Sequence, residues 1–131
     1  MAQQEVELIL TRQLASCLSV PIVLFGPTGD VLFYNEPAES LLGLRFQETG
    51  PLKAGDTERR IHLTDERGGE IPRGERPSAV ALGQQRPAHA RMWLTGADGA
   101  RREVEVTAFP LLGQAGGLLG AAVMFWERAG R

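Results

Sequence analysis

The sequence predicts an α+β fold with five antiparallel strands in one sheet, an amphipathic helix before them, and short helices between the second and third strands. Two short apolar runs, residues 22–25 and 31–34, are joined by a turn that contains Gly29. Residues 88–95 and 103–108 alternate between two kinds of side chain, which is the period of a strand with two different faces. Apolar residues near the N-terminus recur every three or four positions, which predicts the helix.

The first predicted element is this helix, within residues 1–18 and ending before Pro21. Its apolar side chains lie among acidic and other polar residues and form one stripe: Val6, Ile9, Leu10, Leu14, Cys17 and Leu18. Because such a stripe is costly to leave in water, we expect either the protein's own sheet or a second chain to cover it.

The next elements are a hairpin and a short helix. Residues 22–34 predict a β-hairpin, because Gly29 supplies the positive φ that a tight connection requires. Residues 36–42 predict a helix, with Pro37 suited to its first turn and Gly43 as its terminator.

The middle of the chain carries weaker signals. Residues 45–58 contain Gly-Pro and Gly-Asp pairs, which predict a loop with at most one turn of helix. Residues 61–64 and 70–71 flank a turn and predict a small surface hairpin. Residues 76–85 predict a short helix that Gly83 begins to close.

The last third of the chain predicts three strands in succession, over residues 88–95, 103–108 and 118–126. Asp98-Gly99 turns the chain between the first two, and Pro110 is expected to help end the second. The third strand is apolar on both faces and rich in small residues. We therefore expect it to lie centrally, covered on both sides.

Length and composition restrict the class of protein. The 131 residues fit one domain, and 14 basic against 16 acidic residues give a net charge of -2, which does not favour nucleic acid or an anionic membrane. Cys17 is the only cysteine, which excludes an intrachain disulfide and fits a reducing compartment. The sequence shows no signal peptide and no apolar stretch of about 18 residues, so we expect a cytoplasmic protein.

The order and spacing of these elements resemble the PAS domain family, sensory and interaction modules of signalling proteins. The resemblance covers about residues 10–127. The residues that carry it are 21–25, Gly29, Asp30, 31–35, Glu36, Pro37, Ala38, Asp98, Gly99, 108–111 and 120–125. In PAS sequences the asparagine found here as Asn35 closes the second strand before a helix.

The resemblance implies a strand order of 2-1-5-4-3, with residues 118–126 in the middle, as their two-sided apolar character independently indicates. We divide the chain into the N-terminal amphipathic helix in residues 1–18, a PAS-like domain in 19–127 and a tail in 128–131. The run Asp-Ile-Thr that often leads to an effector in PAS proteins is missing after Trp126. We expect either a free-standing module or a piece of a larger protein.

The inward-facing side chains of the predicted strands form the candidate ligand pocket. They carry no charge and no hydrogen-bonding group, so burying a polar ligand such as a dicarboxylate among them would be costly. We expect a small apolar ligand, or a core with no ligand at all. The pocket candidates are Met92, Leu94, Val104, Val106, Ala121, Val123 and Phe125.

No cofactor is expected. Haem needs an axial ligand, but His89 has outward parity and His62 lies in the poorly defined middle. The flavin-binding photosensors of the superfamily that this sequence resembles carry a reactive cysteine in an Asn-Cys-Arg-Phe-Leu-like motif. In this sequence Cys17 lies instead in the N-terminal helix. We therefore expect neither haem nor flavin, and no metal site.

Catalytic patterns are also weak. The histidines share no motif with a serine or with the cysteine that would indicate a nucleophile and its base. Glu103 and Glu105 share one strand face that we expect to be wet, and the glycine-rich residues 113–117 lack the spacing and the lysine of a phosphate-binding loop. We expect a non-enzymatic domain.

The outward face of the sheet indicates an interaction surface. Phe109 and other large apolar side chains fall on it, and the stripe of the N-terminal helix is the nearest candidate to cover them. PAS domains commonly dimerise through these parts, which is what the resemblance implies. The homodimer-interface candidates are Val6, Ile9, Leu10, Leu14, Trp93, Met124 and Trp126.

These observations predict a cytoplasmic PAS-like sensory or regulatory domain of a signal transduction protein, such as a two-component histidine kinase. It would dimerise, bind a small apolar ligand, and act on a fused or separate effector, with no nucleic acid or membrane partner. The alternative is a ligand-free protein–protein interaction module.

Overall fold

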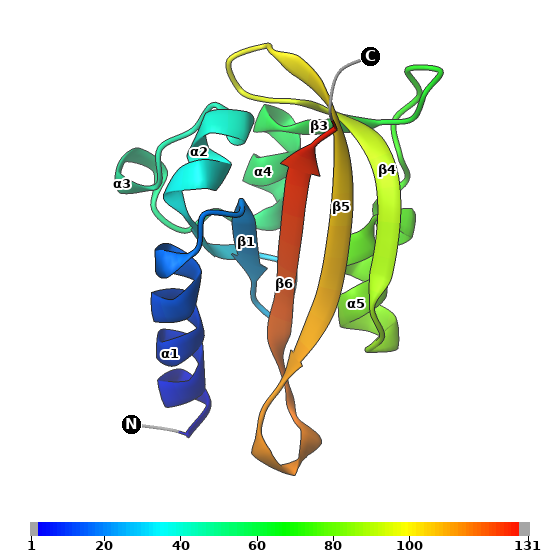
Figure 1. Ribbon diagram of the computed structural model, residues 1–131. Helices are drawn as coiled ribbons and strands as arrows, with labels where there is room; N and C mark the ends of the chain where they lie inside the picture. The colour runs from blue at the N-terminus through cyan, green and yellow to red at the C-terminus, as the bar shows by residue number, and fades with distance from the viewer. Residues whose placement is uncertain (1–2, 129–131) are drawn as a thin grey trace.

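A computed structural model describes residues 3–128 and shows a six-stranded antiparallel sheet with the order β2-β1-β6-β5-β4-β3 (Figure 1). This confirms the α+β fold, with one strand more than predicted. The elements are α1 (Gln3–Cys17), β1 (Ile22–Phe25), β2 (Val31–Tyr34), α2 (Glu36–Leu42), α3 (Phe46–Thr49), α4 (Ala54–Arg60), β3 (His62–Thr64), η1 (Arg73–Glu75), α5 (Pro77–Gln84), β4 (Ala88–Thr95), β5 (Arg101–Leu112), η2 (Gln114–Gly116) and β6 (Leu118–Glu127).

The sheet separates two apolar clusters. The larger one lies between the inner face and the short helices, with α4 and α5 behind the sheet in Figure 1. The smaller one gathers Ala15 of α1 with side chains from β1, β2 and β6 on the outer face. Strand β6 lies between β1 and β5, and most of its residues are buried, as predicted for a central strand. Within residues 3–128, no helix is long and apolar enough to cross a membrane.

The additional strand is β3, which forms the first arm of the predicted surface hairpin. Thr64 forms a bridge with Glu70, as the hairpin requires, and His62 pairs with Thr95 of β4. The hairpin therefore joins the edge of the sheet instead of standing apart from it.

Strand β5 does not end at Pro110, contrary to the expectation. It continues to Leu112, and Pro110 pairs with Ala121 of β6. The pairing of β5 with β4 reaches only to Ala108, so β5 is an edge from there on, where a proline removes no ladder hydrogen bond on the open side.

Two helices, α3 and α4, occupy the segment that we expected to be mostly loop. The first amide of α4, that of Ala54, donates to Asp30 Oδ1 at 3.2 Å, and Arg59 pairs with Asp56 within the helix. The helix start thus depends on an aspartate 24 residues away, which the local sequence does not reveal.

Asn35 joins the elements at the start of the fold. The side chain is 1% exposed, and its Nδ2 donates to the carbonyls of Ala15, at 3.0 Å, and Val20, at 2.9 Å. Its Oδ1 accepts from the amides of Ile22, at 3.0 Å, and Ala38, at 3.2 Å. One amide group therefore links the end of α1, the start of β1 and the first turn of α2, which it also caps.

Helix α2 is fixed at its other end by a close backbone approach. Gly43 takes the left-handed conformation, with φ 70°, that terminates the helix as predicted. The amide of Ala97, in the β4–β5 turn, donates to the carbonyl of Leu42 at 2.8 Å. A Cβ at Gly96 would lie 2.8 Å from that carbonyl oxygen, so only glycine permits this contact.

Asn35→Ala removes the side-chain partner of the backbone groups that Asn35 bonds at Ala15, Val20, Ile22 and Ala38. We expect it to lower the free energy of unfolding by about 2–4 kcal/mol, measured by urea denaturation. Asn35→Asp keeps the acceptor but loses both donor bonds, so it should also destabilise. The exposed Gln47→Ala, in α3, should change stability by less than about 0.5 kcal/mol. Equal stability of all these variants would contradict the role of Asn35.

Candidate functional site

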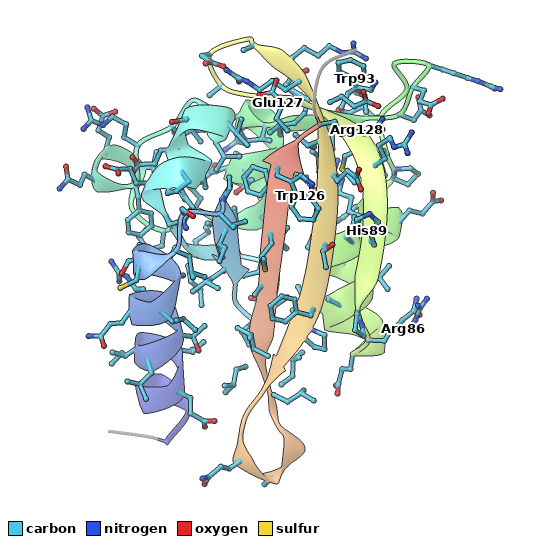
Figure 2. The ribbon with its side chains drawn as sticks, in the orientation of Figure 1. Arg86, His89, Trp93, Trp126, Glu127 and Arg128 are labelled. Atoms are coloured by element: carbon cyan, nitrogen blue, oxygen red, sulfur yellow. The ribbon has the colours of Figure 1, made fainter. Side chains whose placement is uncertain are left out.

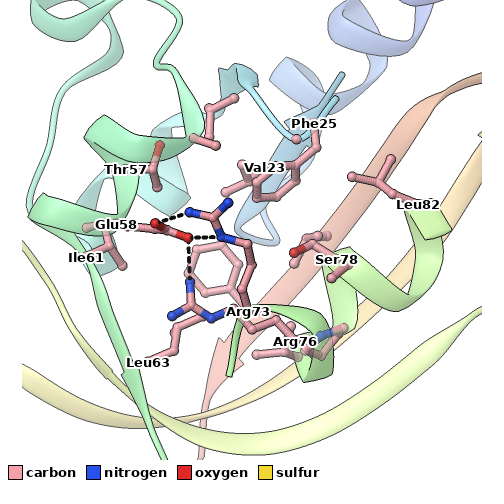
Figure 3. A pocket seen from close by; sticks show the side chains of 18 of the residues that line it. Val23, Phe25, Thr57, Glu58, Ile61, Leu63, Arg73, Arg76, Ser78 and Leu82 are labelled. Carbon is pink, nitrogen blue, oxygen red and sulfur yellow. Dashed lines mark hydrogen bonds and ion pairs between the residues drawn. The ribbon is translucent and has the colours of Figure 1, made fainter. Parts of the chain in front are cut away.

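An apolar cavity of about 450 Å³ lies between the inner face of the sheet and the helices α4 and α5 (Figure 3). This volume is in the usual range for small-molecule sites. Its walls come from strands β1, β2, β3, β4, β5 and β6 and from the helices across them. The apolar side chains that line it include Val23, Phe25, Val31, Leu42, Leu44, Leu52, Ile61, Leu63, Ala79 and Leu82.

Six of the seven predicted pocket residues line this cavity: Met92, Leu94, Val104, Val106, Val123 and Phe125. Ala121 is fully buried in the same apolar cluster but does not line the cavity. The period of the strands places these side chains on one face. The part of the wall that α4 forms was missed, because residues 45–58 carried turn signals that concealed this helix, whereas the helix α5 was predicted.

Charged groups gather at one end of this apolar cavity. Arg73 donates from Nε and Nη2 to the two carboxylate oxygens of Glu58. Arg76 Nη1 lies 3.9 Å from Glu58 Oε2, so the carboxylate lies between two guanidinium groups (Figure 3). The hydrogen bonds from Arg73 hold the pKa of Glu58 below its ordinary value, and the charge of Arg76 acts in the same direction. The cluster therefore holds two cations and one anion near neutral pH.

Tyr34 closes another part of the cavity wall. Its hydroxyl lies 2.6 Å from Thr49 Oγ1, and its ring meets Phe46 edge to face at 5.2 Å. Burial raises the pKa of Tyr34 above its ordinary value of 10.0, while the hydrogen bond with Thr49 opposes the rise. The phenol is thus neutral throughout the physiological range.

Helix α1 turns its predicted apolar stripe away from its own domain. Ala15 is buried against the outer cluster, whereas Ile9, Leu10 and Leu14 are 45%, 59% and 63% exposed. The side chain of Val6 lies outside the part that the structure describes. We expected either the protein's own sheet or a second chain to cover this stripe. For the described residues, the protein's own sheet does not cover it.

The outer face of the sheet carries Trp93 and Trp126, two of the remaining interface candidates (Figure 2). Trp126 is 39% exposed, and Met124 is half-buried beside the outer cluster. Trp93 is half-buried under the guanidinium of Arg101, which lies 4.0 Å from the ring centroid. Both indoles thus stand on the face opposite α4 and α5.

A polar network crosses this face beside Trp126. His89 contacts Thr107 Oγ1 at 2.7 Å through Nδ1 and Glu105 Oε1 at 3.0 Å through Nε2. Arg128 Nε lies 3.5 Å from the other oxygen of Glu105. The strand pairing brings these groups together, and none of them lines the cavity.

The other candidates for cofactor chemistry also lie outside the cavity. Cys17 is exposed at the end of α1, and the imidazole of His62 is exposed on β3 beside Glu70. Within residues 3–128, no three histidine, cysteine, aspartate or glutamate side chains form a group that could hold a metal ion.

No protein-family model matches the chain, and no curated protein matches it significantly. Solved structures do match. The PAS domain of Bordetella pertussis BvgS is 16% identical, with a TM-score of 0.65 over 95% of this chain and 88% of that one. A Rhodobacter sphaeroides LOV protein is 16% identical, with a TM-score of 0.70 over 98% and 71%. The phage VqmA–DPO complex is 11% identical, with a TM-score of 0.67 over 95% and 54%.

The chain therefore has the PAS fold, as its sequence resemblance predicted. Another match is named for a flavin analogue in a light-oxygen-voltage domain, at 12% identity. The cavity walls described here contain no cysteine, so they lack the thiol of the flavin photosensors in the sequence resemblance. The residues that line the cavity therefore do not fit flavin photochemistry that uses a cysteine thiol.

Helix α5 offers a matched test of the cavity. Ala79 lines it, whereas Ala81, on the same helix, is fully buried in the core and does not. Ala79→Leu has room to enter and should change the free energy of unfolding by less than about 0.5 kcal/mol, whereas Ala81→Leu should lower it by about 1–3 kcal/mol through overpacking. Urea denaturation measures both, and equal losses would argue against the open space.

Tyr34 is the only tyrosine, so the ultraviolet absorbance of tyrosinate reports it alone. We expect its midpoint to lie above pH 10.0 in the folded protein and to fall to the ordinary value in urea. The folded pKa is raised above the unfolded value of 10.0. The stability due to neutral Tyr34 is therefore fully present below the unfolded pKa and is lost as the pH rises through the folded pKa. An identical midpoint in both states would contradict the burial of the phenol.

Proposed function

We propose that this chain, which has the PAS fold, is a sensory or regulatory domain of a signal transduction protein, such as a histidine kinase, and that it works as a homodimer. The observation that carries the proposal is that one sheet has an apolar cavity on its inner face and uncovered apolar side chains on its outer face. A cavity gives the domain room to hold a signal molecule, and the outer face gives it a surface through which to pass the signal on.

The ligand proposed for the cavity is small and mainly apolar. Val23, Met92, Val106 and Phe125 present hydrocarbon to it, and burial of a ligand's apolar surface against them contributes about 25 cal/mol per Å². A ligand with many polar groups would lose its hydration there without regaining hydrogen bonds.

The orientation of α1 supports the second copy proposed for the outer face. Leu10 and Leu14 point away from the domain that carries them, and Trp126 lies on the open sheet face. A two-fold axis would let each copy cover the stripe of the other with the same surface. The effector is proposed to be fused to the domain or to bind this dimer, and we place the domain in the cytoplasm, where the exposed thiol of Cys17 stays reduced.

Leu14→Glu tests the dimer without disturbing the core, because the side chain is 63% exposed in the single chain. We expect the wild type to be a dimer at micromolar concentration and Leu14→Glu to be largely monomeric, because the variant buries an unpaired charge at the interface. Native mass spectrometry measures the oligomeric state and reveals any retained compound.

Gln13→Glu, which adds the same charge at the neighbouring exposed position of α1, is the control and should remain dimeric. A monomeric wild type would overturn the dimer. A dimer of bare chain mass that also takes up no apolar probe would favour the ligand-free interaction module.

A further inference from the structure

Of the two arginines at the charged end of the cavity, Arg76 has the fewer hydrogen-bond acceptors. Arg73 already engages both oxygens of Glu58, and Arg76 lies 3.9 Å from one of them. The only hydrogen bond that the Arg76 side chain donates within residues 3–128 runs from Nε to the carbonyl of Ile71, at 3.3 Å. Most of its five N–H donors thus have no protein acceptor, although the side chain is only 16% exposed.

The N-terminus of α5 adds to the positive character of this end. Arg76 is the N-cap residue of α5, yet its side chain makes no capping hydrogen bond in the described structure, and Pro77 follows it. The next two residues, Ser78 and Ala79, line the cavity. Their amides belong to the first turn, where N–H groups have no acceptor within the helix.

We propose that the ligand of this cavity carries one carboxylate on an aliphatic body, and that Arg76 binds the carboxylate while the hydrocarbon fills the apolar space. Two guanidinium groups against one carboxylate leave one positive charge, which a single negative charge balances. The planar fork of arginine matches a carboxylate in two parallel hydrogen bonds. The inference deepens the proposed function and rests on it, because it requires the cavity to be a ligand site.

The charge count favours this class over two others. A neutral aliphatic compound would leave Arg76 partly desolvated with its donors unpaired, which is unfavourable. A dicarboxylate would bring its second charge among side chains such as Met92, Val106 and Phe125, which offer no donor.

Isothermal titration calorimetry with octanoate and 1-octanol tests the inference, because the two probes share their hydrocarbon and differ in the head group. We expect octanoate to bind the wild-type chain at least about tenfold more tightly, as a charged hydrogen bond implies. Arg76→Gln should remove this preference and leave the affinity for 1-octanol unchanged, which also shows that the variant is folded. Arg76→Lys, which keeps the charge and loses the fork, should retain part of the preference.

Arg67→Gln, the same change at an exposed turn residue that does not line the cavity, is the control and should keep the full preference. Equal binding of both probes by the wild type would overturn the inference and leave the apolar site standing. Binding of neither probe would overturn the ligand site itself. A preference for octanoate that survives Arg76→Gln would overturn the role of Arg76.

Discussion

The side-chain amide of Asn35 is the interaction on which the first third of the fold depends. The carbonyls of Ala15 and Val20 and the amides of Ile22 and Ala38 all hydrogen-bond to this one buried side chain. A buried backbone N–H or C=O without a partner is costly, so the end of α1, the start of β1 and the first turn of α2 cannot move independently. Asparagine fits this position because it both donates and accepts at the end of a short side chain.

This anchor determines how α1 meets the rest of the molecule. The carbonyl of Ala15 must face Asn35, so the side of the helix around Ala15 lies against the domain. Arg12 then lies over the ring of Phe33, at 4.8 Å from its centroid, instead of an apolar side chain. Leu10 and Leu14 are left pointing outward, and their exposure follows from the hydrogen bonds at the helix end.

The sequence predicted the parts of the fold that follow from local periodicity. Alternation along β4 and β5 assigned Met92 and Val106 to the inner face and His89 to the outer one, because a strand leaves only two choices of face. Helix α4 could not be predicted, since its first amide is satisfied by Asp30 across the fold. The charged end of the cavity was also missed. Glu58 lies 15 residues before Arg73 and belongs to no motif with Arg73 and Arg76, so the three side chains meet only after folding.

The cavity and the outer face are joined by the backbone of the same two strands. On β5, Val106 lines the cavity and its neighbours Glu105 and Thr107 contact His89 on the opposite face. On β6, Phe125 lines the cavity and the next residue is Trp126. Consecutive residues of a strand point to opposite faces and share a peptide unit, so the inner and outer side chains are attached to the same stretch of backbone. The proposed signal from the cavity to a second copy on the outer face would thus need to cross only the thickness of one sheet.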